Sequence, residues 1–370
     1  MMGVLNHLST LLLLSLLPPA LSHVVDKFSD VPRCQKFFLE GTTPNLPGIL
    51  VGGKVQDQNR YKPICQLFNN IYRFATLYDT TNRIPVFSAY TFTGNTSGRP
   101  SQSWMIEPQL EDINNQRDMK VDNKAVTHNF QAADADYDKN KMKMDRGHLF
   151  PCSHVPDDET MRSTFTLTNA VPQDSSFNRG RWCKMECNVR KYIVENCKNN
   201  NKIEAYVVTG AVPNITNKLN NRVNIPDIMW TAYCCKNNLG QWVAGAHWGE
   251  NKKINTIQPV KRKYPGQTSN TGMHDMLNKS GDDGGGVQVI PDQTSNSLVG
   301  LYDKLNKRYG DGVQLFPDQC PKGDIPRALL LKVGGDEQDH CEYDDCVCSS
   351  VGVKGYYLPV VFVSVLVMMM

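Results

Sequence analysis

The sequence predicts one mixed α+β domain, because strand-like and helix-like segments alternate through its centre. Residues 83–93 (RIPVFSAYTFT), 202–212 and 241–248 are rich in β-branched and aromatic side chains, which is typical of strands. Apolar residues recur at helical spacing from residue 180 to about residue 196 and predict an amphipathic helix. A second amphipathic helix is expected over residues 297–309 (SLVGLYDKLNKRY).

The rest of the chain divides around this domain, and no internal repeat is visible. The first part after the N-terminus contains the turn cluster GTTPNLPG, and residues 251–293 are polar and glycine-rich, as expected for a long loop. The expected division is 1–22 signal peptide, 23–60 loop-rich segment, 61–320 main domain, 321–355 acidic Cys-rich tail and 356–370 hydrophobic tail.

Composition and charge exclude some classes of protein. The chain has 370 residues, of which 40% are hydrophobic and 21% are charged, as in an ordinary globular protein with a core. The formal net charge of +3 is too small to create a basic field over the whole protein. Any attraction for a polyanion must therefore be local, for example at residues 252–253 or 261–263.

The N-terminus has the pattern of a secretory signal peptide. An apolar run from Leu11 to Leu17 is too short to span a bilayer, and Pro18 and Pro19 interrupt it. Small residues follow, so we expect cleavage near Ser22 and a secreted, extracellular protein. Sequons at Asn95, Asn214 and Asn278 agree with a secreted glycoprotein.

The chain has 12 cysteines, and this even number in a secreted protein predicts disulfide bonds. The sequence does not determine their connectivity. A zinc site is disfavoured, because no pair of closely spaced cysteines is followed by a matching pair of Cys or His.

The C-terminal tail, residues 356–370, is apolar throughout and short for a spanning helix. Three interpretations remain open. The tail is a removed signal for a glycolipid anchor at Ser349 or Ser350, a short membrane anchor, or the last strand of a core. The first two predict an association with the membrane.

The stretch DRGH, Asp145 to His148, combines an acid, a permanent cation, a glycine and an imidazole. Cleavage of a phosphodiester needs such groups. Histidine is a suitable general base near neutral pH, and arginine holds a phosphate with several donors. Gly147 lets the backbone approach a substrate, and Asp145 is expected to orient neighbouring groups.

Three further polar residues follow in the segment 164–186. Asn169 lies in a strand-like piece, Asn178 lies at the favoured N-cap position of the predicted helix, and Glu186 lies two turns into that helix. An asparagine oxygen is a neutral ligand for Mg²⁺, which keeps most of its waters, and Glu186 could hold one of those waters. Taken singly, each of these residues is more often a cap, a solvated side chain or a surface ion pair. Their joint order and spacing favour a functional site.

With DRGH, LTNAVPQDSSFN and NRGRW in this order, residues 60–320 resemble the DNA/RNA non-specific endonucleases of the ββα-metal superfamily, which includes endonuclease G. The cysteine-rich setting is most similar to the vertebrate endonuclease domain-containing 1 group. The resemblance implies a ββα-metal (His-Me finger) nuclease fold with a central antiparallel sheet flanked by helices. It also implies His148 as general base, Asn178 as the direct Mg²⁺ ligand, Glu186 acting through metal-bound water, and Arg146 and Asn169 as supporting residues. Mn²⁺ and Ca²⁺ are alternative metals.

One departure from the family pattern concerns an arginine upstream of Trp104. Gln102 stands where this arginine is expected, and Arg99 is a candidate replacement. The leading hypothesis is a secreted Mg²⁺-dependent endonuclease that holds DNA and RNA through their phosphate backbones. The alternatives are a nuclease-fold binding protein with weak or no turnover, which binds nucleic acid or another partner at the cell surface, and a phosphodiesterase for small nucleotides. The sequence leaves the oligomeric state open.

Overall fold

The computed structural model describes residues 23–96, 98, 100–138, 140–253 and 297–323. Several expectations lie outside these residues, namely the signal peptide, Arg99, the sequon at Asn278, most of the long loop and nearly all of the two C-terminal tails. Of the described residues, the great majority belong to one mixed α+β unit.

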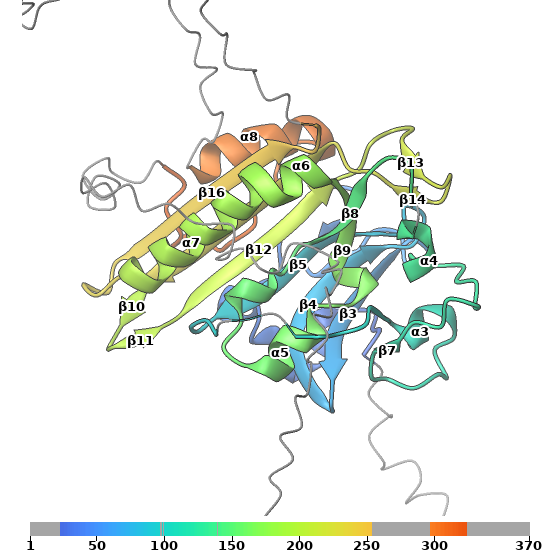
Figure 1. Ribbon diagram of the computed structural model, residues 1–370. Helices are drawn as coiled ribbons and strands as arrows, with labels where there is room; N and C mark the ends of the chain where they lie inside the picture. The colour runs from blue at the N-terminus through green and yellow to red at the C-terminus, as the bar shows by residue number, and fades with distance from the viewer. Residues whose placement is uncertain (1–22, 97, 99, 139, 254–296, 324–370) are drawn as a thin grey trace, which may run out of the picture.

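The centre of the fold is a six-stranded, fully antiparallel sheet with the strand order β16-β15-β12-β5-β4-β3 (Figure 1). The expectation of a central antiparallel sheet is confirmed. Its strands are β3 (Tyr61–Phe68), β4 (Ile71–Asp79), β5 (Ile84–Phe92), β12 (Ala205–Val212), β15 (Ile228–Lys236) and β16 (Trp242–Glu250).

Shorter strands form five two-stranded pairs outside the main sheet. The pair that concerns the site is β8 (Met144–His148) with β9 (Ala170–Asp174). The others are β1 (Leu50–Val51) with β2 (Lys54–Val55), β6 (Met105–Ile106) with β7 (Lys120–Val121), β10 (Lys198–Asn199) with β11 (Lys202–Ile203), and β13 (Lys218–Leu219) with β14 (Val223–Asn224).

Two long helices match the sequence expectation, α7 (Cys183–Asn196) and α8 (Leu298–Tyr309). A short helix α6 (Ser175–Phe177) and a π-helical turn over Asn178–Trp182 lead directly into α7. The remaining helices are short: α2 (Pro32–Gln35), α3 (Pro108–Glu111), α4 (Asp134–Tyr137), α5 (Asp158–Ser163) and the 3-10 turns Phe28–Asp30, Leu39–Gly41, Cys152–His154 and Leu167–Asn169.

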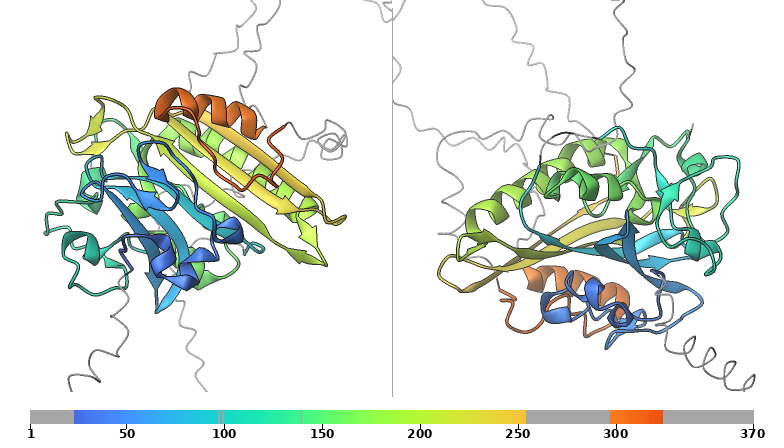
Figure 2. Two further views of the ribbon diagram at one scale, coloured as in Figure 1. Left: turned by 180° about the vertical axis from the view of Figure 1, so that it is seen from behind. Right: turned by 90° about the horizontal axis from the view of Figure 1, so that it is seen from below.

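The sheet separates two hydrophobic cores. Helix α7 covers one face, while α8 and the N-terminal segment cover the other (Figure 2). Alternate side chains of a strand point to opposite faces, so Val207 packs in the core under α7 and Val208 in the core under α8. The strand pair β8–β9 followed by α6 and α7 forms the ββα unit that the sequence predicts.

Disulfide bonds link the layers of the fold. Cys34 pairs with Cys65, Cys197 with Cys235, and Cys234 with Cys320. The neighbouring residues Cys234 and Cys235 of β15 thus point to opposite faces of the sheet. Cys235 is bonded to the end of α7, and Cys234 is bonded to the segment after α8. The other cysteines of the described part, Cys152, Cys183 and Cys187, are disulfide-bonded as well. The expectation of extensive pairing is therefore confirmed for this part of the chain.

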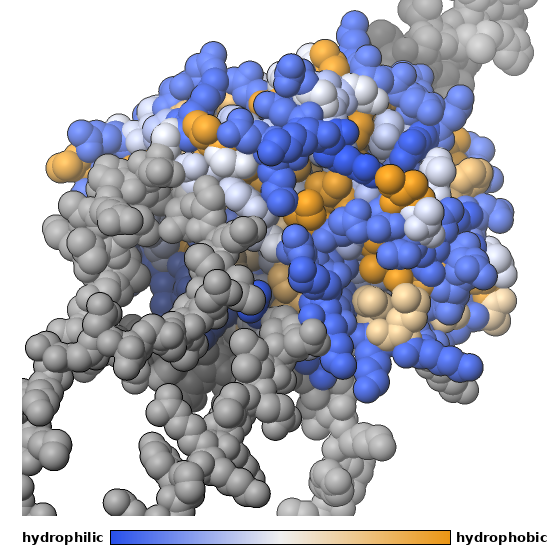
Figure 3. Space-filling model, turned by 90° about the horizontal axis from the view of Figure 1, so that it is seen from above, coloured by the Kyte–Doolittle hydropathy of each residue, from blue (hydrophilic) through white to orange (hydrophobic). Residues whose placement is uncertain are grey.

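The face of the described part that Figure 3 shows is largely hydrophilic. Seen from above Figure 1, hydrophobic residues lie singly or in small groups among hydrophilic ones (Figure 3). No helix in the described ranges is long and apolar enough to cross a membrane.

Candidate active site

The ββα unit brings the DRGH residues to the start of the long helix. Strand β8 pairs with β9 in antiparallel register, with Asp145 opposite Gln173 and His148 opposite Ala170. Gly147 is required here by packing, because a Cβ at this position would lie 2.0 Å from Oε1 of the buried Gln173. Gly147 therefore leaves space for the Gln173 side chain, which reaches from β9 to β8.

The helix begins earlier than the sequence suggests. Asp174 is its N-cap, since its side chain accepts hydrogen bonds from the backbone N–H groups of Ser176 and Phe177. The expectation that Asn178 lies at the N-cap position is wrong, because Asn178 already has helical backbone angles and opens the π-helical turn. This difference removes the capping role that was the alternative explanation for Asn178.

The π-helical turn changes which side chains share a face. The N–H of Cys183 donates to the carbonyl of Asn178, five residues back. In a regular α-helix, Asn178 and Glu186 would be separated by roughly 80° around the axis. One extra residue in the turn reduces this to roughly 20°, so the two residues lie on nearly the same side of the helix.

Asp145 organises the start of this helix. Its carboxylate accepts a hydrogen bond of 3.0 Å from Nδ2 of Asn178 and two from Arg179, at 2.8 and 2.9 Å. Ser175 donates a further hydrogen bond of 2.9 Å. A carboxylate only accepts, so the nitrogen of the Asn178 amide must face Asp145. The Asn178 oxygen is thereby directed away from Asp145 and is available to a cation.

His148 packs between aromatic rings at the end of β8. Its ring centre lies 5.0 Å from that of Trp104 and 4.8 Å from that of Phe165, with which it makes an edge-on contact. The residue is buried, with 6% of its surface exposed. The rotation of the imidazole is therefore limited by its neighbours.

Arg146 is held by acids of helix α4 and the residue that follows it. It forms ion pairs with Asp134 and with Asp138, the second at 3.1 Å, and donates to the Asp134 carbonyl at 2.9 Å. Its guanidinium carbon also lies 5.1 Å from the centre of the Tyr137 ring. The structure thus places Arg146 beside the site, with its charge partly neutralised.

Asn169 is fully buried and its side chain is saturated with hydrogen bonds. Its Oδ1 accepts from Ser88 and from the Phe150 N–H, and its Nδ2 donates to the carbonyls of Phe150 and Thr164. It belongs to the 3-10 turn before β9 rather than to a strand, which corrects the sequence expectation. Asn169 supports the residues after His148 and presents no free group to a substrate.

Glu186 faces the space between α7 and the sheet. It lines a small cavity with Tyr90, His154, Thr209 and other residues. Burial raises the pKa of its carboxyl to about 8, with a smaller opposing effect from the charge of Arg190. The structure therefore places Glu186 on the helix side shared with Asn178, but in a poorly solvated position.

His154 fills the other side of this small cavity. Its Nε2 donates to the Glu186 carbonyl at 2.9 Å, which leaves Nδ1 to accept from the Tyr90 hydroxyl at 2.9 Å. Burial lowers the pKa of His154 to about 4, so the ring is neutral near pH 7. His154 thereby holds the backbone of helix α7 at Glu186.

Several residues around the site were missed by sequence reasoning. Trp104 and Tyr137 contact Arg146, and Arg179 holds Asp145. Aromatic residues without a repeating pattern are more often core, so only three-dimensional proximity distinguishes them. Exposed basic side chains also flank β8 and α6–α7, namely Lys141, Lys143, Arg181 and Lys184.

The residues present fit a hydrated divalent cation better than a fully protein-bound one. The described ranges contain no cluster of three or more His, Cys, Asp or Glu that could hold a metal ion. A single directed amide oxygen beside a buried acid is instead the donor set expected for Mg²⁺, which retains several waters. Asn178 offers that oxygen, and Asp145 fixes its direction.

Comparison with known proteins identifies the family of this chain. The profile of the family described as DNA/RNA non-specific endonuclease matches residues 58–278. The chain belongs to this family. The matched range includes both strands of the hairpin, the helix start and all the site residues discussed above.

Two curated relatives are the endonuclease domain-containing 1 proteins of Homo sapiens and Mus musculus, each 32% identical over 219 and 220 residues respectively. The matches cover 58% of this chain and 41% and 40% of the relatives, so this chain spans about two-fifths of their length. Among solved structures, a chain from the crystal structure of the EndoG/EndoGI complex covers 53% of this chain and 78% of its own length, at 18% identity and a TM-score of 0.39.

Proposed function

We propose that this protein is a Mg²⁺-dependent endonuclease that hydrolyses the phosphodiester bonds of DNA and RNA with little sequence specificity. The observation that carries the proposal is the contact of Asn178 with Asp145, on the strand of the ββα unit that also carries His148. It joins a directed neutral oxygen, an imidazole and a guanidinium within one hairpin and the helix that follows it. Family membership supports the nuclease class.

His148 is the general base in this proposal. Its imidazole takes a proton from the attacking water, a role that suits histidine near neutral pH. Packing against Trp104 and Phe165 restricts the ring, which favours a single reactive orientation. Arg146 supports the site electrostatically from its position between Asp134 and Trp104.

Asn178 would hold the divalent cation through Oδ1, and Glu186 would act through one of its waters. The cation supplies positive charge that compensates the phosphate and the leaving oxygen when it is bound. Asp145 orients the amide, and Arg179 balances the charge of Asp145. Mg²⁺ suits this oxygen donor set, with Mn²⁺ or Ca²⁺ as alternatives.

The nucleic acid would be held through its phosphates. Lys141, Lys143, Arg181 and Lys184 are exposed next to the site and carry no pattern suited to reading bases. Binding of this kind is tolerant of sequence and weakens as salt rises. We therefore expect cleavage of both DNA and RNA.

The proposed compartment is extracellular. The pairing of all described cysteines agrees with an oxidising environment. We propose that the leader is removed near Ser22 and that Asn95, which is exposed, carries a glycan. Surface attachment through the hydrophobic tail concerns residues outside the described ranges.

One observation favours a second function, a nuclease-fold binding protein with weak turnover. Arg146 is engaged by Asp134 and Asp138, and Gln102 stands where the family pattern has an arginine. Few positively charged side chains would then be available to stabilise the negative charge of the transition state. Such a protein would bind nucleic acid with the same salt dependence and cleave it slowly.

Plasmid nicking by the secreted protein separates the two functions. Wild type and His148→Ala are compared with Mg²⁺, with EDTA, and with EDTA followed by excess Mg²⁺. The proposal expects nicking that EDTA stops, that Mg²⁺ restores, and that His148→Ala lacks while still binding DNA. Equal nicking by wild type and His148→Ala would refute His148 as the base, and binding without any nicking would favour the second function.

A further inference from the structure

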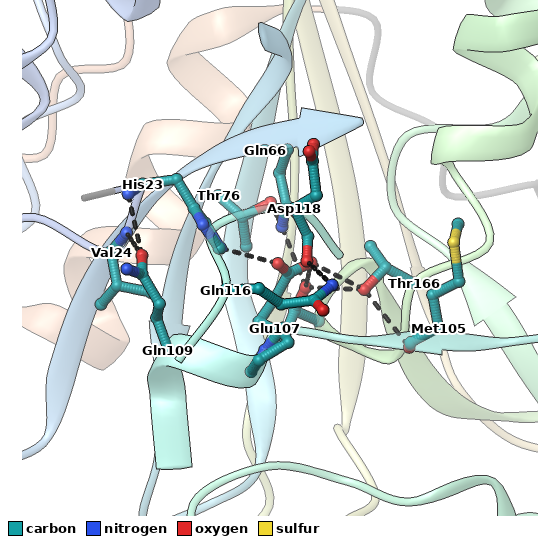
Figure 4. A network of polar contacts seen from close by, with 12 residues as sticks. His23, Val24, Gln66, Thr76, Met105, Glu107, Gln109, Gln116, Asp118 and Thr166 are labelled. Carbon is teal, nitrogen blue, oxygen red and sulfur yellow. Dashed lines mark hydrogen bonds and ion pairs between the residues drawn. The ribbon is translucent and has the colours of Figure 1, made fainter. Parts of the chain in front are cut away.

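A buried polar network begins at the first described residue and ends next to His148. The imidazole Nε2 of His23 lies 2.8 Å from Oε2 of Glu107, and Thr166 and Thr168 donate to Oε1 of the same carboxylate at 2.9 and 3.2 Å (Figure 4). Figure 4 shows His23 pointing toward Glu107 from the other side of the carboxylate. His23 and Glu107 have no exposed surface.

Gln66 connects this carboxylate to the strands of the central sheet. Its Nε2 donates to Thr168 at 2.9 Å and to Thr76 at 3.1 Å. Thr76 lies 3.0 Å from the Ser88 hydroxyl, and Ser88 donates to Oδ1 of Asn169 at 2.9 Å. Each of these side chains is fully buried, so solvent does not replace a lost partner.

The directions of the hydrogen bonds along the path from Glu107 to Asn169 follow from the acceptors at its two ends. Glu107 can only accept, so Thr168 donates to it and must receive from Gln66. The second hydrogen of the Gln66 amide then goes to Thr76, which donates to Ser88. A change at Glu107 therefore removes the acceptor of Thr168, the residue that helps to hold the Gln66 amide in place for Thr76.

The network contacts Leu149 and Phe150 through Asn169. Its Oδ1 accepts from the Phe150 N–H at 2.9 Å, its Nδ2 donates to the Phe150 carbonyl at 3.0 Å, and its backbone carbonyl accepts from the Leu149 N–H at 2.8 Å. These are the two residues that directly follow His148. Their backbone sets the direction in which His148 leaves β8.

We propose that His23 and Glu107 are positioning residues of the nuclease site, because the network that starts at them holds Leu149 and Phe150 and thereby places His148. This inference rests on the proposed function, in which His148 is the base. The N-terminal segment is then a part of the catalytic apparatus, although it contacts no reacting group. A displacement of about 1 Å at a reacting group can lower a rate about 100-fold.

The test uses the full secreted chain and two ways to interrupt the network. His23→Ala removes the imidazole, and Thr168→Val removes one hydroxyl with almost no change of shape. His23→Gln restores a donor to Glu107. Tyr302→Phe is the matched control, because it removes a buried hydrogen bond, to the Leu315 N–H at 3.1 Å, on the opposite face of the sheet.

Two measurements are made on each variant. The first is hydrogen–deuterium exchange of the peptide containing Leu149 and Phe150, with the α8 peptide as reference. We expect faster exchange at this segment in His23→Ala and Thr168→Val, and unchanged exchange in α8. The second is plasmid cleavage, where we expect kcat to fall about 10- to 100-fold with KM for DNA unchanged, and His23→Gln to recover most of the loss.

The outcomes are separable. Unchanged exchange at Leu149 and Phe150, or equal acceleration in α8, would overturn the inference, since the network would then be absent or only a source of global stability. If the wild type is active and a variant shows faster exchange at Leu149 and Phe150 with an unchanged kcat, the inference is overturned too. An inactive wild type would refute the proposed function. The inference would then be refuted as well, even if the exchange experiment shows that His23 and Glu107 are coupled to Leu149 and Phe150. If His23→Ala does not fold, Thr168→Val gives the decision.

Discussion

Asn178 donates its side-chain amide hydrogen to the carboxylate of Asp145 over 3.0 Å, and this contact determines which way the amide oxygen points. Arg179 holds the same carboxylate with two hydrogen bonds from the next helical residue. Asp145 therefore has a fixed position before it orients Asn178. The sequence motif joins this acid to the proposed base, whereas in the structure the acid contacts Asn178, the proposed metal ligand.

The first prediction concerns this orientation. Asp145→Asn should lower the cleavage rate and raise the Mg²⁺ concentration needed for half-maximal rate, with losses of about 10- to 100-fold, as is typical of groups that orient a ligand. An asparagine at position 145 cannot accept from Asn178 and Arg179 as fully, so the amide loses its fixed direction. Mg²⁺ titrations of the cleavage rate measure the effect.

Asp157→Asn is the control for this change. Asp157 is another acid at a helix start, where it accepts a hydrogen bond of 2.7 Å from the Thr160 N–H, and it lies on helix α5 away from the hairpin. Its replacement should leave the Mg²⁺ curve unchanged. A wild-type Mg²⁺ curve for Asp145→Asn would show that the carboxylate does not set the direction of the ligand.

A second prediction separates the helix cap from the metal ligand. Asp174→Ala removes the N-cap and should cost about 1 kcal/mol of folding free energy, while the Mg²⁺ dependence of cleavage stays as in wild type. Asn178→Ala should slow cleavage severely, and excess Mg²⁺ should rescue it little. Thermal melts and Mg²⁺ titrations of both variants are run together. A normal Mg²⁺ curve for Asn178→Ala would remove this residue as the ligand.

The sequence predicted which segments form the ββα unit better than it predicted their local geometry. The order of DRGH, Asn178 and Glu186 was enough to identify the residues of the ββα unit, because each motif lies within one element. The helix start was misplaced, since both Asp174 and Asn178 are favourable caps and local propensity does not choose between them. The π-helical turn could not be predicted, because no residue pattern in this segment distinguishes it from a regular helical turn.

Long-range polar contacts were also beyond the sequence. His23 and Glu107 are separated by 84 positions, and nothing in the pattern around either residue indicates a partner. The restraint on Arg146 had a visible source in the acids of residues 134–138 (DADYD), but their contact with the arginine depends on how α4 packs against β8. Strand and helix periods, by contrast, follow from burial of one face, which explains why those elements were found.

A third prediction compares two buried histidines. His148→Ala should abolish cleavage in a folded protein, because it removes the proposed base, and its melting temperature should also fall, because the buried ring packs between Trp104 and Phe165. His154→Ala should lower the melting temperature strongly, since it leaves the Tyr90 hydroxyl and the Glu186 carbonyl without their partner. Circular dichroism melts and plasmid nicking give both values. Similar effects of the two substitutions on both measurements would contradict the separate roles.

The last prediction concerns the pH dependence of stability caused by Glu186. Burial raises the pKa of this carboxyl to about 8 from an ordinary value of 4.5, so the folded protein keeps a proton that the unfolded chain releases between these values. The stability linked to this proton is fully present below pH 4.5, declines as pH rises, and is lost once pH passes 8. The glutamine of Glu186→Gln cannot ionise, so the melting temperature of this variant should rise relative to wild type between pH 5 and pH 9.

Melts are recorded in EDTA, and the control is Glu195→Gln, which changes an exposed acid on the same helix. The depressed pKa of His154 acts in every variant alike and cancels in the difference. A difference between Glu186→Gln and wild type that stays constant over this range would show that the Glu186 carboxyl is ionised and solvated in the folded protein.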